Sequence, residues 1–141
     1  MQNLPKKNIN SELYDVAARE NVAVIACALP RTHSVSVMDE AGQCAIGMDT
    51  ALCGRGERTH LAHELGHCLT GSFYEQDSPD WYRERCEYKA NKWAIRHLVP
   101  RASLRLAAAD GATQCWQLAE IFGVTEEFMQ KAIDYYKDVE K

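Results

Sequence analysis

The chain has 141 residues, a formal net charge of −4, 46% hydrophobic residues and 26% charged residues. This composition is that of an ordinary globular protein, long enough to bury most of its apolar surface in one domain. The acidic balance argues against nucleic acid or an anionic membrane as a main partner, and no apolar run reaches the length of a membrane span. We expect a single domain whose N-terminal, central and C-terminal parts are residues 1–54, 55–100 and 101–141.

The N-terminal part predicts one helix followed by a small sheet. Ser11 is expected to cap this helix, which ends near Asn21 and has apolar residues on one side. Residues 22–26 are all apolar, which is typical of a buried strand, whereas residues 34–38 alternate as a half-exposed strand does. After a turn, residues 44–48 form a returning strand. The three strands predict a small antiparallel or mixed sheet.

The central part contains the most informative pattern, His-Glu-Leu-Gly-His at residues 63–67, within a helix expected from about Arg55 to Thr70. Two histidines four residues apart lie about 40° apart around a helix axis, so both imidazoles can face one metal ion. Glu64 lies beside them, as a residue that accepts a proton from water must. The pattern predicts metal-assisted amide hydrolysis. The alternative is an amphipathic helix whose histidines only face solvent.

A second helix, expected from about Trp81 to His97, supplies candidates for a third metal ligand. Catalytic zinc sites typically have three protein ligands and one open position. Glu84 and Glu87 share part of one helix face, and Glu75 in the preceding loop is a weaker candidate, so the spacing leaves Glu84 and Glu87 open. Asn91 follows Glu87 by one turn and can orient a ligand imidazole. The alternative is a solvated, charged helix face.

The C-terminal part predicts helices over residues 101–109, 113–122 and 126–137. Residues 118–125 resemble the turn of helix-turn-helix DNA readers, which makes a DNA-binding module the competing class. From Thr113 onward, however, the chain has three Lys, no Arg and six acidic residues. A recognition helix should be basic to meet phosphates, so we interpret this turn as packing geometry and expect no direct nucleic-acid binding.

The cysteines form no C-x-x-C pair, and residues 1–10 show no signal peptide. We therefore expect a cytoplasmic protein with reduced thiols and no disulfide. Cys68 and Cys86 adjoin the candidate ligands, but each lies about 100° around its helix from its neighbour, away from the metal face. The six cysteines are Cys27, Cys44, Cys53, Cys68, Cys86 and Cys115.

Residues 61–67, 87–94 and 98–100 read L-A-H-E-L-G-H, E-Y-K-A-N-K-W-A and L-V-P. Together they resemble the ImmA/IrrE metallopeptidases, whose pattern is A-H-E-L-G-H, a gap, E-x-x-A-N-x-F-A and an L-L-M-P-like end. Trp93 and Val99 stand where that family usually has Phe and Met, apolar for apolar. The resemblance is good over the central part of the chain and weaker in the segment after Thr113.

The resemblance implies an α+β fold in which a small three-stranded sheet packs on a mainly helical, zincin-like metallopeptidase core. It favours Glu87 over Glu84 as the third ligand, and it implies Zn²⁺ as the cofactor. The implied site consists of the metal ligands His63, His67 and Glu87, the catalytic Glu64 and the supporting residue Asn91.

By the same resemblance, the function is that of a bacterial zinc endopeptidase. Its protein substrate is expected to be a specific XRE-like helix-turn-helix repressor of a phage, mobile element or stress locus. The alternative is a zinc-stabilised protein that cleaves nothing and binds a repressor or a toxin–antitoxin-like partner. Glu64 argues against this alternative, because a purely structural zinc site has no use for that carboxylate.

The sequence does not determine two features of the expected site, the strand that binds the substrate and the side chain that stabilises the oxyanion. Peptidases of this kind add the substrate as a strand at a sheet edge, and the hairpin of residues 34–48 is the candidate for that edge, although its outermost strand is undetermined. A side chain that stabilises the oxyanion is also expected. Its candidates are His60, Tyr74, Tyr82 and His97.

Overall fold

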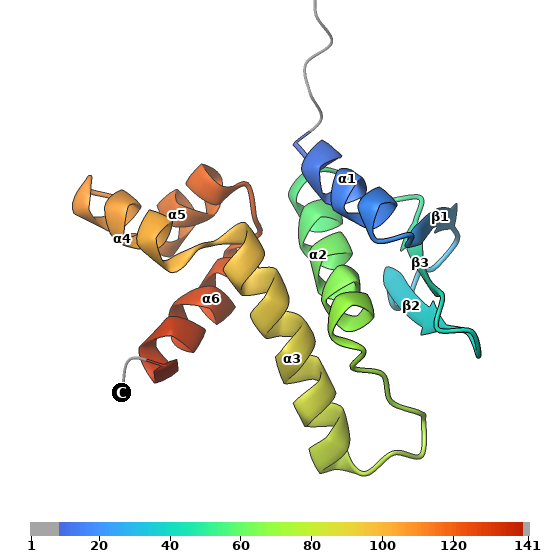
Figure 1. Ribbon diagram of the computed structural model, residues 1–141. Coiled ribbons are helices and arrows are strands. Elements are labelled where there is room, and N and C mark those ends of the chain that lie inside the picture. The colour runs from blue at the N-terminus through green and yellow to red at the C-terminus, as the bar shows by residue number, and fades with distance from the viewer. Residues whose placement is uncertain (1–8, 140–141) are drawn as a thin grey trace, which may run out of the picture.

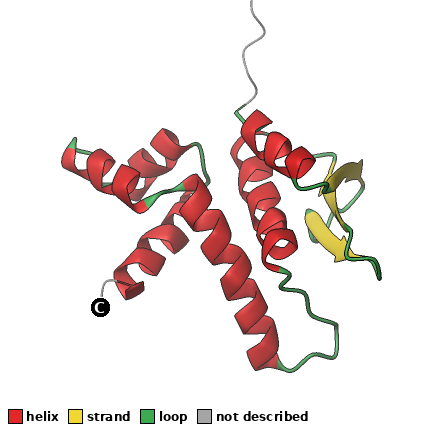
Figure 2. Ribbon diagram, viewed as in Figure 1, coloured by secondary structure: helices red, strands yellow, loops and turns green. Residues whose placement is uncertain are grey.

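The computed structural model describes residues 9–139, which form six helices and one three-stranded sheet. Figure 2 shows that helices make up most of the molecule and that the sheet lies at one side. The α+β class expected from the sequence is therefore confirmed. Residues 1–8 and 140–141 lie outside the described part. The prediction about a signal peptide concerns residues 1–10, most of which therefore lie outside the described part as well.

The N-terminal part forms helix α1 (Ser11–Arg19) and strands β1 (Ala23–Cys27), β2 (Ser34–Met38) and β3 (Cys44–Asp49). The strand order is β1-β3-β2, with β1 parallel to β3 and β2 antiparallel to it, so the sheet is mixed. The central strand is β3, and both β1 and β2 are edges.

The prediction that the first strand is buried is wrong. Strand β1 is mostly exposed, and Ile25 keeps 56% of its surface accessible. An all-apolar run is typical of a strand covered on both faces. Here helices pack against one face of the sheet, and Ile25, Val35 and Val37 stay exposed on the described part of the other face.

Helix α2 (Gly54–Thr70) lies between the sheet on one side and helix α3 (Asp80–Leu98) on the other (Figure 1). Leu61 and Leu65 are fully buried in the core together with Ile46 of β3. Gly71 ends α2 in the left-handed conformation, with φ 64°, as expected for a glycine that closes a helix.

Helices α2 and α3 approach each other closely at Gly66. A Cβ atom at this position would lie 2.4 Å from the backbone oxygen of Ala90 and 2.9 Å from its Cα. Since neither atom belongs to a flexible side chain, only glycine fits there. This crossing brings the first half of α3 against the face of α2 that carries the two histidines.

The chain ends in helices α4 (Arg101–Ala109), α5 (Cys115–Phe122) and α6 (Glu126–Val139), close to the predicted ranges. The turn between α5 and α6 passes through Gly123, which is left-handed with φ 65°. Met129 and Ala132 of α6 are fully buried, and the Tyr136 hydroxyl donates a 2.6 Å hydrogen bond to the Val99 carbonyl. Helix α6 is therefore a core element that packs beside the end of α3.

The expectation of six reduced cysteines is also wrong, because Cys44 of β3 and Cys68 of α2 form a disulfide. Their side chains meet between the sheet and the helix, at a Cα–Cα distance of 5.9 Å that is ordinary for such a bond. The two cysteines are 24 residues apart in the sequence and meet only through tertiary packing, so no local C-x-x-C pattern predicts the pairing. The other four cysteines are free thiols.

Among the described residues, no helix has the length and apolar character that crossing a membrane requires.

Candidate metal centre

The two histidines of α2 point to the same place. His63 and His67 face each other with their Nε2 atoms 3.2 Å apart and their rings in an edge-on arrangement. His67 is buried and His63 is half-buried. The helical spacing of four residues thus produces the convergence that the sequence predicts.

Glu87 of α3 completes the cluster. Its Oε2 lies 3.0 Å from His63 Nε2, and its Oε1 lies 3.2 Å from His67 Nε2. The three candidate ligand atoms all lie within 4.8 Å of one another. Glu84 and Glu75 are exposed and take no part in this cluster. Of the carboxylates that the spacing left open, the fold brings Glu87 to the histidines.

The electrostatics of the cluster reflect close contact between opposite charges. Burial alone would raise the pKa of Glu87, but hydrogen bonds from His63, His67 and Tyr74 lower it well below its usual value. Burial alone would lower the pKa of His67, but the hydrogen bond to Glu87 and another to the Ser72 carbonyl raise it above its usual value. A cation would take the place of the protons that now link these side chains.

The other nitrogen of each histidine ring is held by an oxygen. His63 Nδ1 lies 2.8 Å from Asn91 Oδ1, and His67 Nδ1 lies 2.6 Å from the Ser72 carbonyl. Because both oxygens only accept, each Nδ1 carries the hydrogen, and each Nε2 is left to bind a metal. The sequence pattern identifies Asn91. It misses Ser72, which acts through its backbone and has no side-chain signature.

The donor set fits a zinc ion. Zinc prefers imidazole nitrogen and carboxylate oxygen at about 2.0–2.2 Å in a tetrahedral arrangement, for which neighbouring ligand atoms lie about 3.3 Å apart. The Nε2 atoms of His63 and His67 lie 3.2 Å apart, which is close to this value, and one ligand atom from each of His63, His67 and Glu87 lies within 4.8 Å of the other two. An ion held by these three residues would have one position without a protein ligand, as catalytic zinc sites do.

Glu64 is buried beside the cluster, with 7% of its surface exposed, and strand β2 holds its carboxylate. Ser34 Oγ donates a 2.7 Å hydrogen bond to Glu64 Oε2, and Ser36 Oγ donates a 2.8 Å bond to Oε1. The single hydrogen of Ser34 is used in this way, so Ser34 Oγ accepts the 3.0 Å bond from His60 Nδ1. Sequence reasoning missed both serines, although their alternation in the strand places them on one face.

A cleft of about 300 Å³ opens over the cluster. Its walls come from β2, from α2, from the loop after Gly71 and from α3. Strand β2 is an edge of the sheet and lines this cleft, so the structure identifies the strand of the predicted hairpin that borders the site.

Tyr74 is the only one of the four oxyanion candidates that contacts the cluster. Its hydroxyl donates a 2.7 Å hydrogen bond to Glu87 Oε1, and this bond, with burial, raises the pKa of Tyr74 to about 12. The other three have partners elsewhere: Ser34 for His60, the Phe73 carbonyl for Tyr82, and Glu12 for His97.

Residues 54–134 match the protein family described as Peptidase M78, the IrrE N-terminal-like domain. The match begins at the first residue of α2 and ends within α6, so it includes both helices that carry the cluster. It covers more than half of the 141 residues. A comparison with curated proteins finds no match.

Proposed function

Because the chain belongs to the Peptidase M78 (IrrE N-terminal-like) family, we propose that it is a zinc-dependent endopeptidase of the His-Glu-x-x-His type. The observation that carries the proposal is the convergence of His63, His67 and Glu87 within 4.8 Å, in a cleft that also contains Glu64. Family membership implies a protein substrate.

Zinc in this position would supply a Lewis acid and lower the pKa of water toward neutrality. Glu64 accepts the proton of the attacking water and passes it to the leaving amine, as a general base that becomes a general acid. Ser34 and Ser36 each occupy one lone pair of the carboxylate and leave another free on each oxygen. The two serines thus orient Glu64 without blocking proton transfer.

Tyr74 is the residue that we assign to the oxyanion. Its hydroxyl lies at the cluster and lines the same cleft as Glu64. A preformed donor beside the reacting carbonyl stabilises the charge that develops there. Its present acceptor is a ligand oxygen of Glu87, so a small rotation of the ring would redirect the hydroxyl toward substrate.

The substrate is proposed to lie along β2 as an additional strand. This edge has main-chain N–H and C=O groups that β3 does not use, and an extended segment can pair with them. The likeness of the motifs to the ImmA/IrrE peptidases supports a bacterial, cytoplasmic protease whose substrate is an XRE-like repressor of a phage, mobile element or stress locus. The Cys44–Cys68 disulfide is evidence against a cytoplasmic location, because thiols there are kept reduced. Incubation with the product of a neighbouring repressor-like gene, with and without a chelator, tests this assignment.

The decisive variant is Glu64→Gln, which retains the size of the side chain but removes the base. We expect zinc content to stay at about one ion per chain and cleavage to fall about 10²–10⁴-fold. Glu87→Ala should instead lose most of the metal, and Glu84→Ala, on the same helix, should retain it. If Glu64→Gln cleaved the substrate at the wild-type rate, the proposed mechanism would be excluded. The remaining alternative would be a zinc-stabilised binding protein.

A further inference from the structure

Positive charge is concentrated in one segment of this acidic chain. Residues 81–109 contain seven Lys or Arg and two Glu, a net charge of +5. The remaining residues contain nine Lys or Arg and eighteen Asp or Glu, a net charge of −9. The overall value of −4 therefore conceals a basic region that comprises α4 and all of α3 except its first residue, Asp80.

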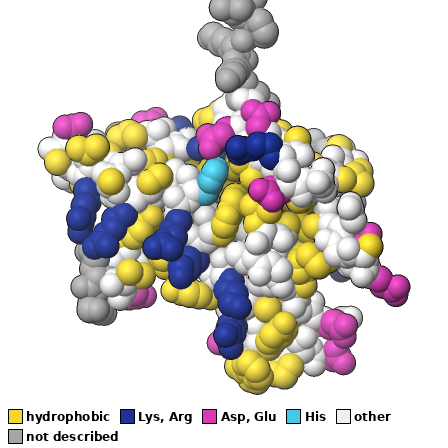
Figure 3. Space-filling view, in the orientation of Figure 1, with side chains coloured by type: hydrophobic (Ala, Val, Ile, Leu, Met, Phe, Trp, Pro, Cys, Tyr) yellow, Lys and Arg dark blue, Asp and Glu magenta, His cyan; other side chains and the backbone are white. Residues whose placement is uncertain are grey.

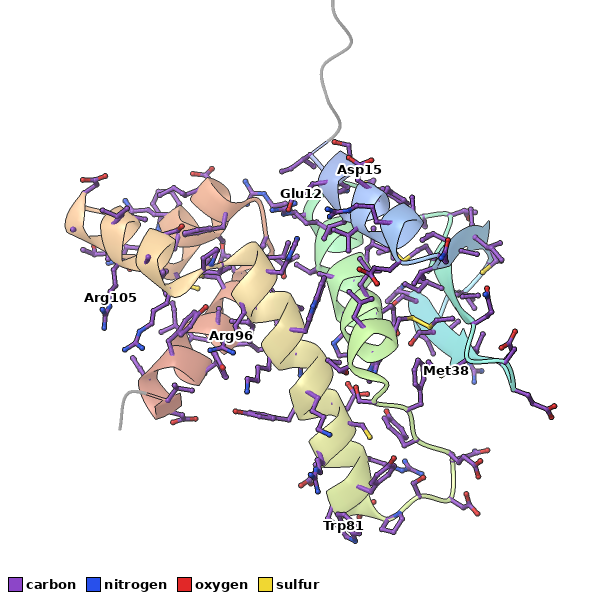
Figure 4. All side chains as sticks on the ribbon, in the orientation of Figure 1. Glu12, Asp15, Met38, Trp81, Arg96 and Arg105 are labelled. Atoms are coloured by element: carbon purple, nitrogen blue, oxygen red, sulfur yellow. A yellow bond between two sulfur atoms is a disulfide. The ribbon has the colours of Figure 1, made fainter. Side chains whose placement is uncertain are left out.

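Within α3, four of these residues share one helix face. Arg85, Lys89, Lys92 and Arg96 are spaced by four, three and four positions, so they fall within about 60° around the helix axis and about 17 Å along it. We call them the basic stripe. Figure 3 shows Lys and Arg side chains in a row over this part of the surface, and Arg105 of α4 is labelled near the same side in Figure 4.

The basic stripe is not neutralised by the described part of the chain. No residue of the basic stripe forms an ion pair with a carboxylate of residues 9–139, and all except half-buried Lys92 are exposed. Opposite charges three or four residues apart on a solvent-exposed helix face stabilise the helix, whereas like charges at these spacings destabilise it. Solubility alone would therefore not require four positive charges on one face. A local cost that the described residues do not compensate is typical of a functional surface.

Aromatic side chains border the basic stripe. A hollow of about 460 Å³ is lined by Lys89, Lys92 and Arg96 together with Trp93 and His97, whose rings are stacked with centroids 4.9 Å apart. At the N-terminal end of α3, Trp81 keeps 65% of its surface exposed (Figure 4). Trp and Arg are the residues that most often dominate the energetics of protein interfaces.

We propose that the basic stripe docks a short acidic segment of a protein partner. A partner side chain in the Trp93 hollow would add apolar contact to the charge pairing. The length of about 17 Å matches a short peptide. A long nucleic acid would run beyond α3 and α4 toward the rest of the chain, whose residues sum to a net charge of −9 and include Glu12 and Asp15 of α1 (Figure 4).

This docking goes beyond the proposed peptidase function and does not depend on it. Glu87 lies on the opposite side of α3 from the basic stripe, by about half a turn of the helix. Neither the metal nor Glu64 contributes to this surface. Binding should therefore persist after metal removal and in Glu64→Gln, so a failure of the proposed mechanism would leave this inference untouched.

The test uses the full chain and a fluorescent probe peptide of about 14 residues that contains several glutamates and one leucine. The stripe variant is Lys89→Glu/Lys92→Glu, and the matched control is Arg31→Glu/Arg55→Glu, which makes the same charge change at two exposed positions elsewhere. We expect the dissociation constant to rise at least about tenfold in the stripe variant and to change less than about twofold in the control. A peptide with glutamines in place of glutamates should not bind.

Thermal unfolding is measured as well, in order to distinguish a loss of binding from a loss of folding. The new carboxylates would lie one turn from Arg85 and Arg96, so the stripe variant should unfold at the same temperature as the wild type or at a higher one. If both variants weakened peptide binding equally, the overall charge of the protein and not the basic stripe would control binding, and the proposal would be overturned. It would also be overturned if duplex DNA or phosphatidylserine vesicles bound more tightly than the peptide and lost binding in the stripe variant.

Discussion

At the residue scale, the candidate centre depends on which nitrogen each histidine presents. Asn91 and the Ser72 carbonyl take the Nδ1 hydrogens of His63 and His67, which leaves both Nε2 atoms directed at Glu87. An imidazole without such a partner rotates and exchanges tautomers, so part of the binding free energy is spent on ordering it. Metal affinity should therefore be sensitive to residues that never touch the ion.

The first prediction concerns Asn91→Ala. This change removes the acceptor of the His63 Nδ1 hydrogen and should weaken zinc binding about 10–100-fold, as measured by competition with a chromophoric chelator. Glu84→Ala, an exposed change on the same helix, serves as the control and should retain wild-type affinity. Equal affinities in Asn91→Ala and the wild type would mean that the hydrogen bond does not orient the ligand.

The second prediction compares two glycines of α2. Gly66→Ala places a methyl group against the Ala90 backbone and should destabilise the fold by about 1–3 kcal/mol while weakening metal binding, because α2 and α3 must separate. Gly56→Ala meets only Leu52 at 3.7 Å, so it should stabilise the helix by about 0.5–1 kcal/mol. Urea unfolding of both variants measures the difference. If Gly66→Ala unfolds like the wild type, the close crossing is not real.

At the element scale, local patterns predicted helices and strands well, because apolar spacing and end signals act over a few residues. Glycine closes α2 at the expected position, and the strand pairs follow the expected hairpin. The exposure of β1 was not predictable, since the same apolar run suits a strand covered on one face or two. The Cys44–Cys68 disulfide was missed for a similar reason, because it depends on how β3 packs against α2.

The third prediction follows from this disulfide, which closes a loop of 24 residues between β3 and α2. A loop of this length restricts the unfolded chain enough to stabilise the fold by about 3 kcal/mol. We expect reductant to lower the urea midpoint of the wild type and of Cys53→Ser, but to leave Cys68→Ser unchanged. Titration of the unfolded, unreduced protein with a thiol reagent should find four free thiols; six would contradict the bond.

At the scale of the whole molecule, the three candidate ligands come from two helices that a loop separates. The spacing of His63 and His67 is local and could be predicted, as could the presence of a carboxylate on the next helix. Ser34, Ser36 and Tyr74 contact the site only because the sheet and the loop fold over it. The spacing of residues in the sequence does not predict such contacts. The sequence thus predicts the cluster of His63, His67 and Glu87 and gives Tyr74 as one of four oxyanion candidates, but it does not indicate the two serines that hold Glu64.

The fourth prediction is that metal removal loosens the junction of α2 and α3. A ligand that binds only the folded state at a concentration 100 times its dissociation constant stabilises that state by about 2.7 kcal/mol. For a chain of this size, excess chelator should lower the melting temperature by roughly 5–10 °C. Glu87→Ala already lacks a ligand and should not respond. An unchanged wild-type melting curve would argue against a bridging metal.

The edge position of β2 bears on how a target would be chosen. Pairing through main-chain groups places little demand on side chains, but it requires an extended segment, which a folded target exposes only when it opens locally. Where opening and reclosing are fast compared with cleavage, the rate follows the population of the open form, and about 1.4 kcal/mol of local stability changes it tenfold. A peptidase built in this way would respond to the folding state of its target, and a target protected by its own partners would outlast the same protein released from them.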